Sequence, residues 1–239
     1  VHYKPSKPTA MAFAIALKLP LEEARDYALA GCLDLNLPGK SRINALGMFI
    51  VPKVLDITMH NGIMRETGER IGPETGEMRD FKSYEDFEAA FKKQLYYFMG
   101  MYNEEHNILI RVTRAVNCDV VHSAFAYDGI KCGKDIMDRK MPYENASLLN
   151  PVGMISVANS LAAVKKLVFQ DQVCTMEELF QAIEADWEGH EELHKRCVAA
   201  PKFGNGDDLV DDIAADLYRF WANSCNTFTT VYGVPPRPT

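Results

Sequence analysis

The stretch Asp26–Asp34, DYALAGCLD, sets one thiol, Cys32, two residues before one carboxylate, Asp34. In an extended loop, residues two apart point to the same side of the backbone, so both groups can face one cavity. A nearby carboxylate raises the pKa of a thiol, which argues against a thiolate nucleophile. It suits a thiol that transfers a hydrogen atom while Asp34 handles substrate protons. The alternative is a buried cysteine beside a solvated aspartate, which is the commoner environment of a free cysteine.

Composition narrows the function classes. The 239 residues are 47% apolar and 25% charged, which predicts one large or two small globular domains rather than a disordered or fibrous chain. No stretch approaches the roughly 18 uninterrupted apolar residues of a membrane span. The net charge is −7 and the basic residues are scattered, which argues against nucleic-acid binding. Six cysteines without a C-x-x-C pair argue against a zinc ribbon and indicate a reducing, cytoplasmic environment.

Apolar periodicity predicts a helix-rich chain with a few short strands. We expect a loop at Gly31–Lys40, a helix over Ile43–Met59 interrupted at Pro52, and an exposed turn or hairpin over Asn61–Arg79. Ser83 can cap a strong helix, which continues as helix or buried strand over 105–121.

The second half of the chain follows the same pattern. An irregular loop is expected over Gly129–Asn150, and a helix from near Gly153. Thr175 and Glu178 form a capping-box pattern, and a last helix follows Asp207. We expect the apolar stripes of these helices to pack partly against surface that these 239 residues do not supply.

Two other motifs are weaker candidates for a functional site. His190-Glu191-Glu192-Leu193-His194 matches H-E-x-x-H, in which two histidines on one helix face hold zinc and Glu191 acts as general base. The downstream glutamate or histidine ligand is missing, so we favour a solvated helix face and expect no metal. Pro201–Asp208, PKFGNGDD, has glycines but no Gly-Lys-Ser/Thr ending, so a turn and helix cap is favoured over a phosphate site.

Four ordered blocks resemble the glycyl radical enzymes, the superfamily of pyruvate formate-lyase and related dehydratases and decarboxylases. The first is Asp26–Asp34, which resembles the family's active-site cysteine loop. The second block consists of Asn61-Gly62, Gly72–Gly76 (GPETG), Phe81–Glu85 (FKSYE) and Phe91–Gln94 (FKKQ). The third is Asn159–Phe169 (NSLAAVKKLVF), and the fourth is Pro201–Asn205 (PKFGN) followed by Asp207-Asp208. The family also has a Gly-aromatic-Glu-Glu-Leu helix before the last block, where Gly189–Leu193 stands, which further weakens the zinc hypothesis.

The resemblance implies an α/β fold, part of a ten-stranded barrel that is helix-rich and incomplete in this chain. Residues 1–239 are then a single partial catalytic domain, an internal fragment that lacks the N-terminal half-barrel and the C-terminal glycyl radical domain. Whether it is a natural product or a sequencing fragment, it is expected to be inactive alone. Cys32 matches the thiyl position. A radical S-adenosylmethionine activating enzyme installs the radical on a glycine outside this chain, and no cofactor binds the chain itself. The resemblance also implies a small organic substrate, a homodimer and an anaerobic source.

Departures from the family pattern bear on the reaction. Where the dehydratases carry Gly-Cys-Val-Glu-Pro, this chain has Asp34 and Leu35 at the last two positions. Aspartate is one methylene shorter, which favours a carbon–carbon lyase similar to the arylacetate decarboxylases. The alternatives are a dehydratase, an arylsuccinate synthase or, in another class, a zinc hydrolase. By analogy with decarboxylases His60 contacts substrate, although a satisfied core histidine is the simpler interpretation.

Overall fold

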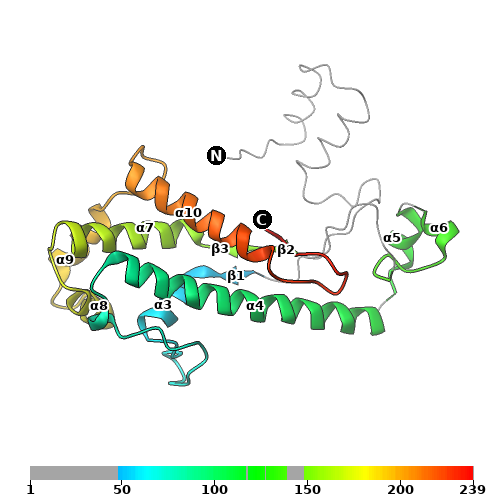
Figure 1. The fold of residues 1–239 in the computed structure, drawn as a ribbon, viewed down its shortest axis with the longest axis horizontal. Coiled ribbons are helices and arrows are strands. Elements are labelled where there is room, and N and C mark those ends of the chain that lie inside the picture. The colour runs from blue at the N-terminus through cyan, green and yellow to red at the C-terminus, as the bar shows by residue number, and fades with distance from the viewer. Residues whose placement is uncertain (1–47, 117, 127, 139–147, 239) are drawn as a thin grey trace, which may run out of the picture. The chain divides into compact units, whose positions relative to one another are not determined.

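The computed structural model describes residues 48–116, 118–126, 128–138 and 148–238 (Figure 1). The chain divides into two compact units. The first comprises residues 1–46, 106–148 and 229–237, and the second comprises residues 47–105, 149–228 and 238–239. No helix in the described ranges is long and apolar enough to cross a membrane.

Two strand–helix steps organise the second unit. Strand β1 (Phe49–Ile50) leads directly into helix α3 (Val51–Met59), and β3 (Pro151–Val152) leads through Gly153 into α7 (Met154–Val164). The strands pair in parallel, with Phe49 opposite Pro151. Parallel strands, each followed by a helix, are the pattern of an α/β fold.

Pro52 begins a helix rather than interrupting one. The sequence predicted a helix over 43–59 broken at this proline, whereas the described part of that range is β1 followed by α3. Pro52 lies in the first turn of α3, where its missing N–H costs no intrahelical hydrogen bond. Its ring also contacts the start of α7, because a Cβ on Gly153 would lie 2.6 Å from Pro52 Cγ.

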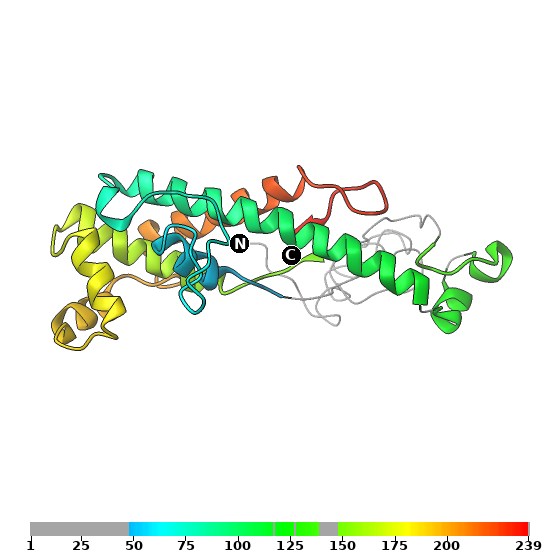
Figure 2. The ribbon, with the colours of Figure 1, turned by 90° about the horizontal axis from the view of Figure 1, so that it is seen from below.

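Three helices enclose the core of the second unit. They are the first part of α4 (Tyr84–Val116, which leaves this unit after Glu105), α7 and α10 (Asp208–Cys225). Figures 1 and 2 show α7 and α10 side by side. The apolar periodicity predicts stripes at Phe87, Phe91, Leu95 and Phe98, at Val157, Leu161, Val164 and Val168, and at Leu209, Val210, Ile213, Leu217 and Phe220. Nine of these side chains are buried, and Phe98, Val164, Leu209 and Phe220 are half-buried.

Shorter elements complete the second unit. They are the 3-10 helix η1 (Met78–Asp80), the π-helix η2 (Lys165–Gln170) that continues α7, and helices α8 (Met176–Glu184) and α9 (Glu191–Ala199). The predicted caps are confirmed: Ser83 Oγ accepts from Asp86 N at 3.1 Å, and Thr175 and Glu178 exchange side-chain-to-backbone hydrogen bonds.

The described part of the first unit combines a few buried apolar side chains, such as Ile110 and Ile136, with polar contacts. It contains the second part of α4, α5 (Val120–Phe125) and α6 (Gly129–Cys132). Asp135 accepts hydrogen bonds from Asp119 N (2.8 Å) and Ser123 Oγ (3.1 Å). The expectation of irregular loop from residue 129 was therefore wrong for α6 and for β2 (Leu148–Leu149), which pairs with β4 (Arg237–Pro238).

Candidate functional site

The two residues predicted to carry the chemistry, Cys32 and Asp34, lie outside the described residues. The residues of the other motifs, from His60 onward, all lie within the described ranges. They fall into four places: the end of α3, the turn that follows it, the segment joining η2 to α9, and the turn before α10.

His60 ends helix α3 and is mostly buried, with 14% of its side chain exposed. Its Nδ1 lies 2.8 Å from the carbonyl oxygen of Asp56, one turn back. Its Nε2 lies 3.3 Å from Glu184 Oε1 but is not aligned for a hydrogen bond. The ring packs edge-on against Phe180, with ring centroids 5.3 Å apart. Its described neighbours therefore come from α3 and α8, and its predicted contact with substrate stays a prediction.

The turn after α3 is a closed hydrogen-bonded clasp, which we call the Asn61 clasp and define as Asn61, Gly62, Gly72–Gly76 and Gln94. Asn61 Oδ1 accepts from the backbone N–H groups of Thr75 (2.7 Å) and Gly76 (3.0 Å). Gln94, fully buried on α4, donates from Nε2 to Pro73 O at 2.6 Å. The prediction of an exposed turn or hairpin is confirmed for residues 65–70, which are exposed and flanked by an antiparallel bridge between Ile63 and Arg70. It was wrong for Gly62 and Gly72, which the clasp buries against α4.

Backbone geometry explains the amino acids of the clasp. Asn61 and Gly62 both have positive φ (52° and 84°), and Gly62 N donates to Ile57 O at 2.8 Å, which closes the end of α3 as a Schellman motif. A Cβ on Gly62 would lie 2.5 Å from Pro73 O. These residues of the second block are thus accounted for by local folding alone.

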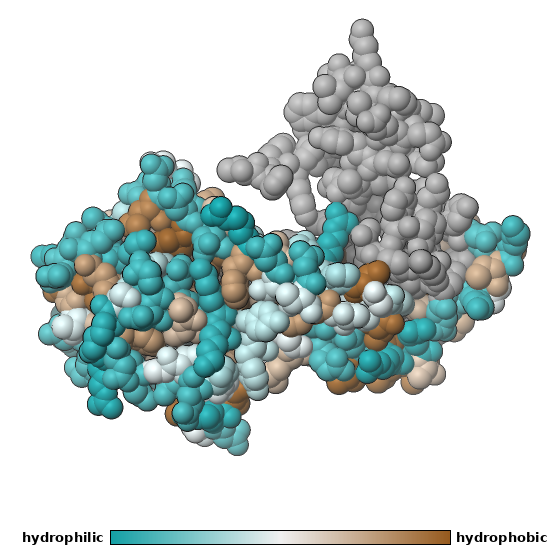
Figure 3. Space-filling view, viewed as in Figure 1, coloured by the Kyte–Doolittle hydropathy of each residue, from teal (hydrophilic) through white to brown (hydrophobic). Residues whose placement is uncertain are grey.

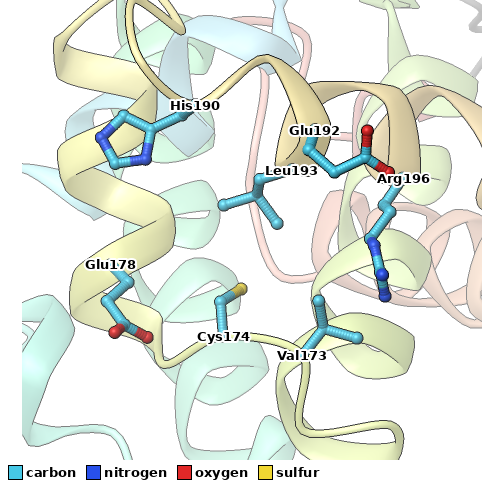
Figure 4. Close-up of a pocket in the computed structure, with 7 residues that line it drawn as sticks. All are labelled: Val173, Cys174, Glu178, His190, Glu192, Leu193 and Arg196. Atoms are coloured by element: carbon cyan, nitrogen blue, oxygen red, sulfur yellow. The ribbon is translucent and has the colours of Figure 1, made fainter.

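Two adjoining cavities lie between η1, the end of η2 and helices α8 and α9. The larger, about 710 Å³, is lined by residues that include Arg79, Phe81 and Phe169. The smaller, about 350 Å³, is drawn in Figure 4, where the Cys174 sulfur points toward Leu193. Burial raises the pKa of the Cys174 thiol to about 11, so this thiol is protonated at neutral pH and is a poor nucleophile.

The H-E-x-x-H motif does not assemble as a metal site. His190 is the residue before α9 and has a non-helical backbone, so it and His194 do not share a helix face. The His194 ring stacks on Trp187 with centroids 4.7 Å apart, and Glu191 Oε1 accepts from Gly189 N. Among the described residues, no three His, Cys, Asp or Glu side chains converge on a point where a metal could bind.

The turn before α10 is tied to its neighbours by side chains of two family-like blocks. Asn159 Oδ1, on α7, accepts from Phe203 N at 2.8 Å. Lys202 Nζ donates to the carbonyl oxygens of Cys197 (3.1 Å) and Ala200 (2.6 Å), which caps the end of α9. Asp207 Oδ1 accepts from Leu209 N and caps α10. The preference for a turn and helix cap over a phosphate cradle thus agrees with the contacts.

A family comparison decides the relationship that the four blocks suggested. The sequence profile of the family described as "Pyruvate formate lyase-like" matches residues 9–239. The chain belongs to this family, the glycyl radical enzymes. The match includes the cysteine loop at 26–34 and all of the described elements.

Named relatives in this family have several activities. The chain is 32% identical to trans-4-hydroxy-L-proline dehydratase of Clostridioides difficile, covering 89% of this chain and 27% of that protein. It is 32% identical to (2S)-3-sulfopropanediol dehydratase of Klebsiella oxytoca (82% and 24%) and 27% identical to indoleacetate decarboxylase of Tractidigestivibacter scatoligenes (90% and 27%). The chain thus spans about a quarter of the length of these curated relatives.

Solved structures of family members agree with the fold. Hydroxyproline dehydratase of Clostridioides difficile, with trans-4-hydroxy-L-proline bound, superposes with a TM-score of 0.81 at 29% identity, over 96% of this chain and 29% of that one. The B12-independent glycerol dehydratase of Clostridium butyricum gives 0.79 at 27% identity, over 97% and 29%. The predicted fold class, a helix-rich and incomplete part of this family's α/β barrel, is confirmed.

Sequence reasoning missed the structural roles of Gln94 and Asn159. Both lay inside quoted blocks, but their partners lie 21 and 44 residues away along the chain. A polar residue inside an otherwise apolar helical stripe was the available signal, because a buried amide side chain needs hydrogen-bond partners.

Proposed function

We propose that this chain supplies the reactive cysteine of a glycyl radical lyase. The observation that carries the proposal is the sequence Gly31–Asp34, GCLD, inside a family match that covers residues 9–239. A glycyl radical outside these residues, installed by a radical S-adenosylmethionine activating enzyme, supplies the unpaired electron. The hydrogen atom of the Cys32 S–H bond passes to that glycyl radical, and the sulfur, now a thiyl radical, takes a hydrogen atom from a carbon of the substrate. After the substrate bond has broken, the product radical takes a hydrogen atom back and the thiol is restored.

Asp34 determines which reaction of the family this enzyme catalyses. Its carboxylate accepts or returns the proton that substrate cleavage requires, and it reaches one methylene less far than the glutamate of the dehydratases. We therefore favour carbon–carbon cleavage of the arylacetate decarboxylase kind. Dehydration is the alternative, supported by the 32% identity to hydroxyproline dehydratase against 27% to indoleacetate decarboxylase. Arylsuccinate synthesis is a further alternative, which the glycine before Cys32 fits less well.

The partners and location follow from this proposal. A small organic acid is the expected substrate, His60 is a candidate substrate contact, and the activating enzyme is the protein partner. The full-length protein is expected to be a homodimer, as the family resemblance implies, and to be cytoplasmic, as its cysteine usage indicates. Its radical chemistry needs a closed, dry cavity.

The test is anaerobic turnover by the full-length protein with its activating enzyme. Cys32→Ala should keep the glycyl radical signal in electron paramagnetic resonance but lose turnover, because the relay to substrate is gone. Cys132→Ala removes an exposed thiol and should retain turnover. Turnover that survives in Cys32→Ala would show that the assignment of Cys32 is wrong.

The substrate branch needs a separate measurement. The wild-type protein is supplied in turn with an arylacetate, a polyol and trans-4-hydroxy-L-proline, and the products are identified by mass spectrometry. Release of CO2 from the arylacetate supports the decarboxylase branch, whereas dehydration of either hydroxylated compound supports the alternative. Asp34→Asn should form the radical and turn over slowly, because the amide cannot transfer the proton.

A further inference from the structure

The carboxyl ends of two helices meet at His60. This residue follows α3 directly, and Glu184 is the last residue of α8. His60 Nε2 lies 3.3 Å from Glu184 Oε1, and the ring packs edge-on against Phe180, one turn earlier on α8. The carboxyl end of a helix carries partial negative charge, which a cation stabilises and a carboxylate opposes. Two such ends with a carboxylate between them therefore need a cation.

Hydrogen bonding determines where the His60 ring carries its protons. Nδ1 lies 2.8 Å from the carbonyl oxygen of Asp56, and a carbonyl only accepts, so Nδ1 holds a hydrogen. In a neutral imidazole the other nitrogen is then a bare acceptor. Among the residues that the structure describes, the buried Nε2 has no hydrogen-bond partner, and it faces the acceptor oxygen of Glu184. A second proton on Nε2 turns this contact between two acceptors into an ion pair.

The charges around the ring balance when His60 is a cation. Asp56 Oδ1 lies 3.4 Å from Nδ1, and the remaining ion pairs join Lys53 to Asp56 (2.7 Å) and Glu66 (2.6 Å), and Arg65 to Glu184 (3.4 Å). With a neutral ring, two cations face three carboxylates, whereas a protonated ring makes three of each. His60 is the least exposed of the six, so water screens its charge least. Figure 3 shows mainly hydrophilic surface over the turn after α3, at the lower edge of the view.

We propose that His60 is an imidazolium ion that joins the end of α8 to the end of α3, a contact that we call the His60 joint and define as His60, Asp56, Glu184 and Arg65. The joint holds while the ring keeps its second proton. As the pH rises and that proton leaves, Nε2 and Glu184 repel each other and the end of α8 loosens. Because α8 lines both cavities and the Asn61 clasp begins directly after His60, this proton controls how firmly these parts are held together.

The first experiment measures backbone amide exchange of the full-length protein by mass spectrometry at one pH near neutrality. The variants are Glu184→Gln, His60→Asn and the two combined, and the shorter amide in His60→Asn can reach Asp56 O but not Glu184. The control is Glu188→Gln, because Glu188 is exposed four residues further on. We expect the amides of α8 to exchange about two- to fivefold faster in each single variant. The double variant should be no faster, and the control should match the wild type.

The direction of the Glu184→Gln effect separates the joint from the helix dipole. The dipole alone predicts slower exchange, since this variant removes a carboxylate from the negative end of α8. Faster exchange requires a cation that faces Glu184. Equal effects in the single and double variants then assign that cation to His60 rather than to Arg65.

A second measurement follows the ring itself. The hydrogen on the carbon between the two ring nitrogens of a histidine exchanges with deuterium at a rate that follows the protonation of the ring. Mass spectrometry of the peptide that contains His60 reads this rate against pH. Glu184→Gln should move the titration to lower pH, because the charged ring loses its partner, and Glu188→Gln should not move it.

Any of several results would overturn the joint. They are slower or unchanged exchange of α8 in Glu184→Gln, additive effects in the double variant, and an unmoved titration. If His60→Asn does not fold, Arg65→Gln takes its place, and Glu184→Gln must still speed the exchange of α8 in that background. Lost turnover in His60→Asn with unchanged exchange of α8 would assign the ring to substrate instead. Both readouts are independent of turnover, so failure of the Cys32 proposal would leave this inference standing.

Discussion

At the scale of single residues, several positions that resemble the family blocks are explained by backbone geometry. Asn61 and Gly62 hold positive φ values that end α3, and the side chain of Asn61 then bonds to the loop at 75–76. Gln94 fills the space beside Gly72, so a Cβ on residue 72 would collide with the side-chain oxygen of Gln94. Resemblance to a family motif therefore does not by itself mark a residue as catalytic.

The two glycines Gly62 and Gly68 allow a matched test of this explanation. Both have positive φ (84° and 70°), so alanine at either position pays the backbone penalty of about 1–2 kcal/mol. Only at Gly62 would the new Cβ also meet backbone, 2.5 Å from Pro73 O; around Gly68 nothing lies within 4 Å. We expect Gly62→Ala to lower the free energy of unfolding clearly more than Gly68→Ala in urea denaturation. Equal losses would mean that the clasp is not closely packed.

At the scale of elements, the ends of the helices follow the sequence closely. Thr175 and Glu178 form the reciprocal capping box at the start of α8, with Thr175 N donating to Glu178 Oε2 at 2.7 Å. These hydrogen bonds to the Thr175 backbone and hydroxyl hold the pKa of the Glu178 carboxyl below its usual range. Capping uses residues three apart in the sequence, so it is visible before any tertiary structure is known.

This lowered pKa has a defined consequence for stability against pH. Because the folded pKa lies below the unfolded one, the capping contribution is fully present above the unfolded value near 4.5 and is lost as the pH falls through the folded pKa. Glu178→Gln keeps a neutral acceptor but does not titrate. We expect its thermal midpoint to fall less than that of the wild type between neutral and acidic pH. Glu177→Gln is the neighbouring control and should keep the wild-type profile; if both variants behave alike, Glu178 is not the responsible group.

At the scale of the whole molecule, one aromatic chain connects distant parts of the second unit. Trp221 of α10 packs on Phe49 of β1 at 5.3 Å, and Phe49 packs on Tyr102 of α4 at 5.4 Å. Trp221 Nε1 also donates to Leu149 O at 3.3 Å. Phe49, in the short strand β1, thus contacts residues 53 and 172 positions away in the sequence, and these contacts hold the strand in place, since a strand of two residues supplies little stability itself.

Removing the centre of this chain should be costly. Trp221 is 1% exposed, so Trp221→Ala leaves a cavity, and we expect a loss of about 3–5 kcal/mol in the free energy of unfolding. Tyr218, on the same helix but 42% exposed, is the control, and Tyr218→Ala should change stability by less than about 0.5 kcal/mol. Guanidinium denaturation followed by far-UV circular dichroism measures both. A small loss at Trp221 would show that the aromatic chain does not hold the strand.

Local signals were enough for much of the fold. The stripe at Phe87, Phe91 and Leu95, the cap at Ser83 and the capping box at Thr175 each depend on residues within two helical turns, and each is confirmed. The family was likewise evident from the four blocks. Pro52 was misjudged because the local sequence looks the same whether a proline lies in the first turn of a helix or interrupts a longer one. Only the strand before it distinguishes them.

The sequence by itself therefore determined the three long helices, their predicted caps and the family, because periodicity and capping are properties of neighbouring residues. The tertiary structure alone decided that the turn at 61–76 is clasped to α4 and that His194 stacks on Trp187. Each of these depends on which distant groups meet, and the free energy of such contacts comes from packing and hydrogen bonds that no local pattern records.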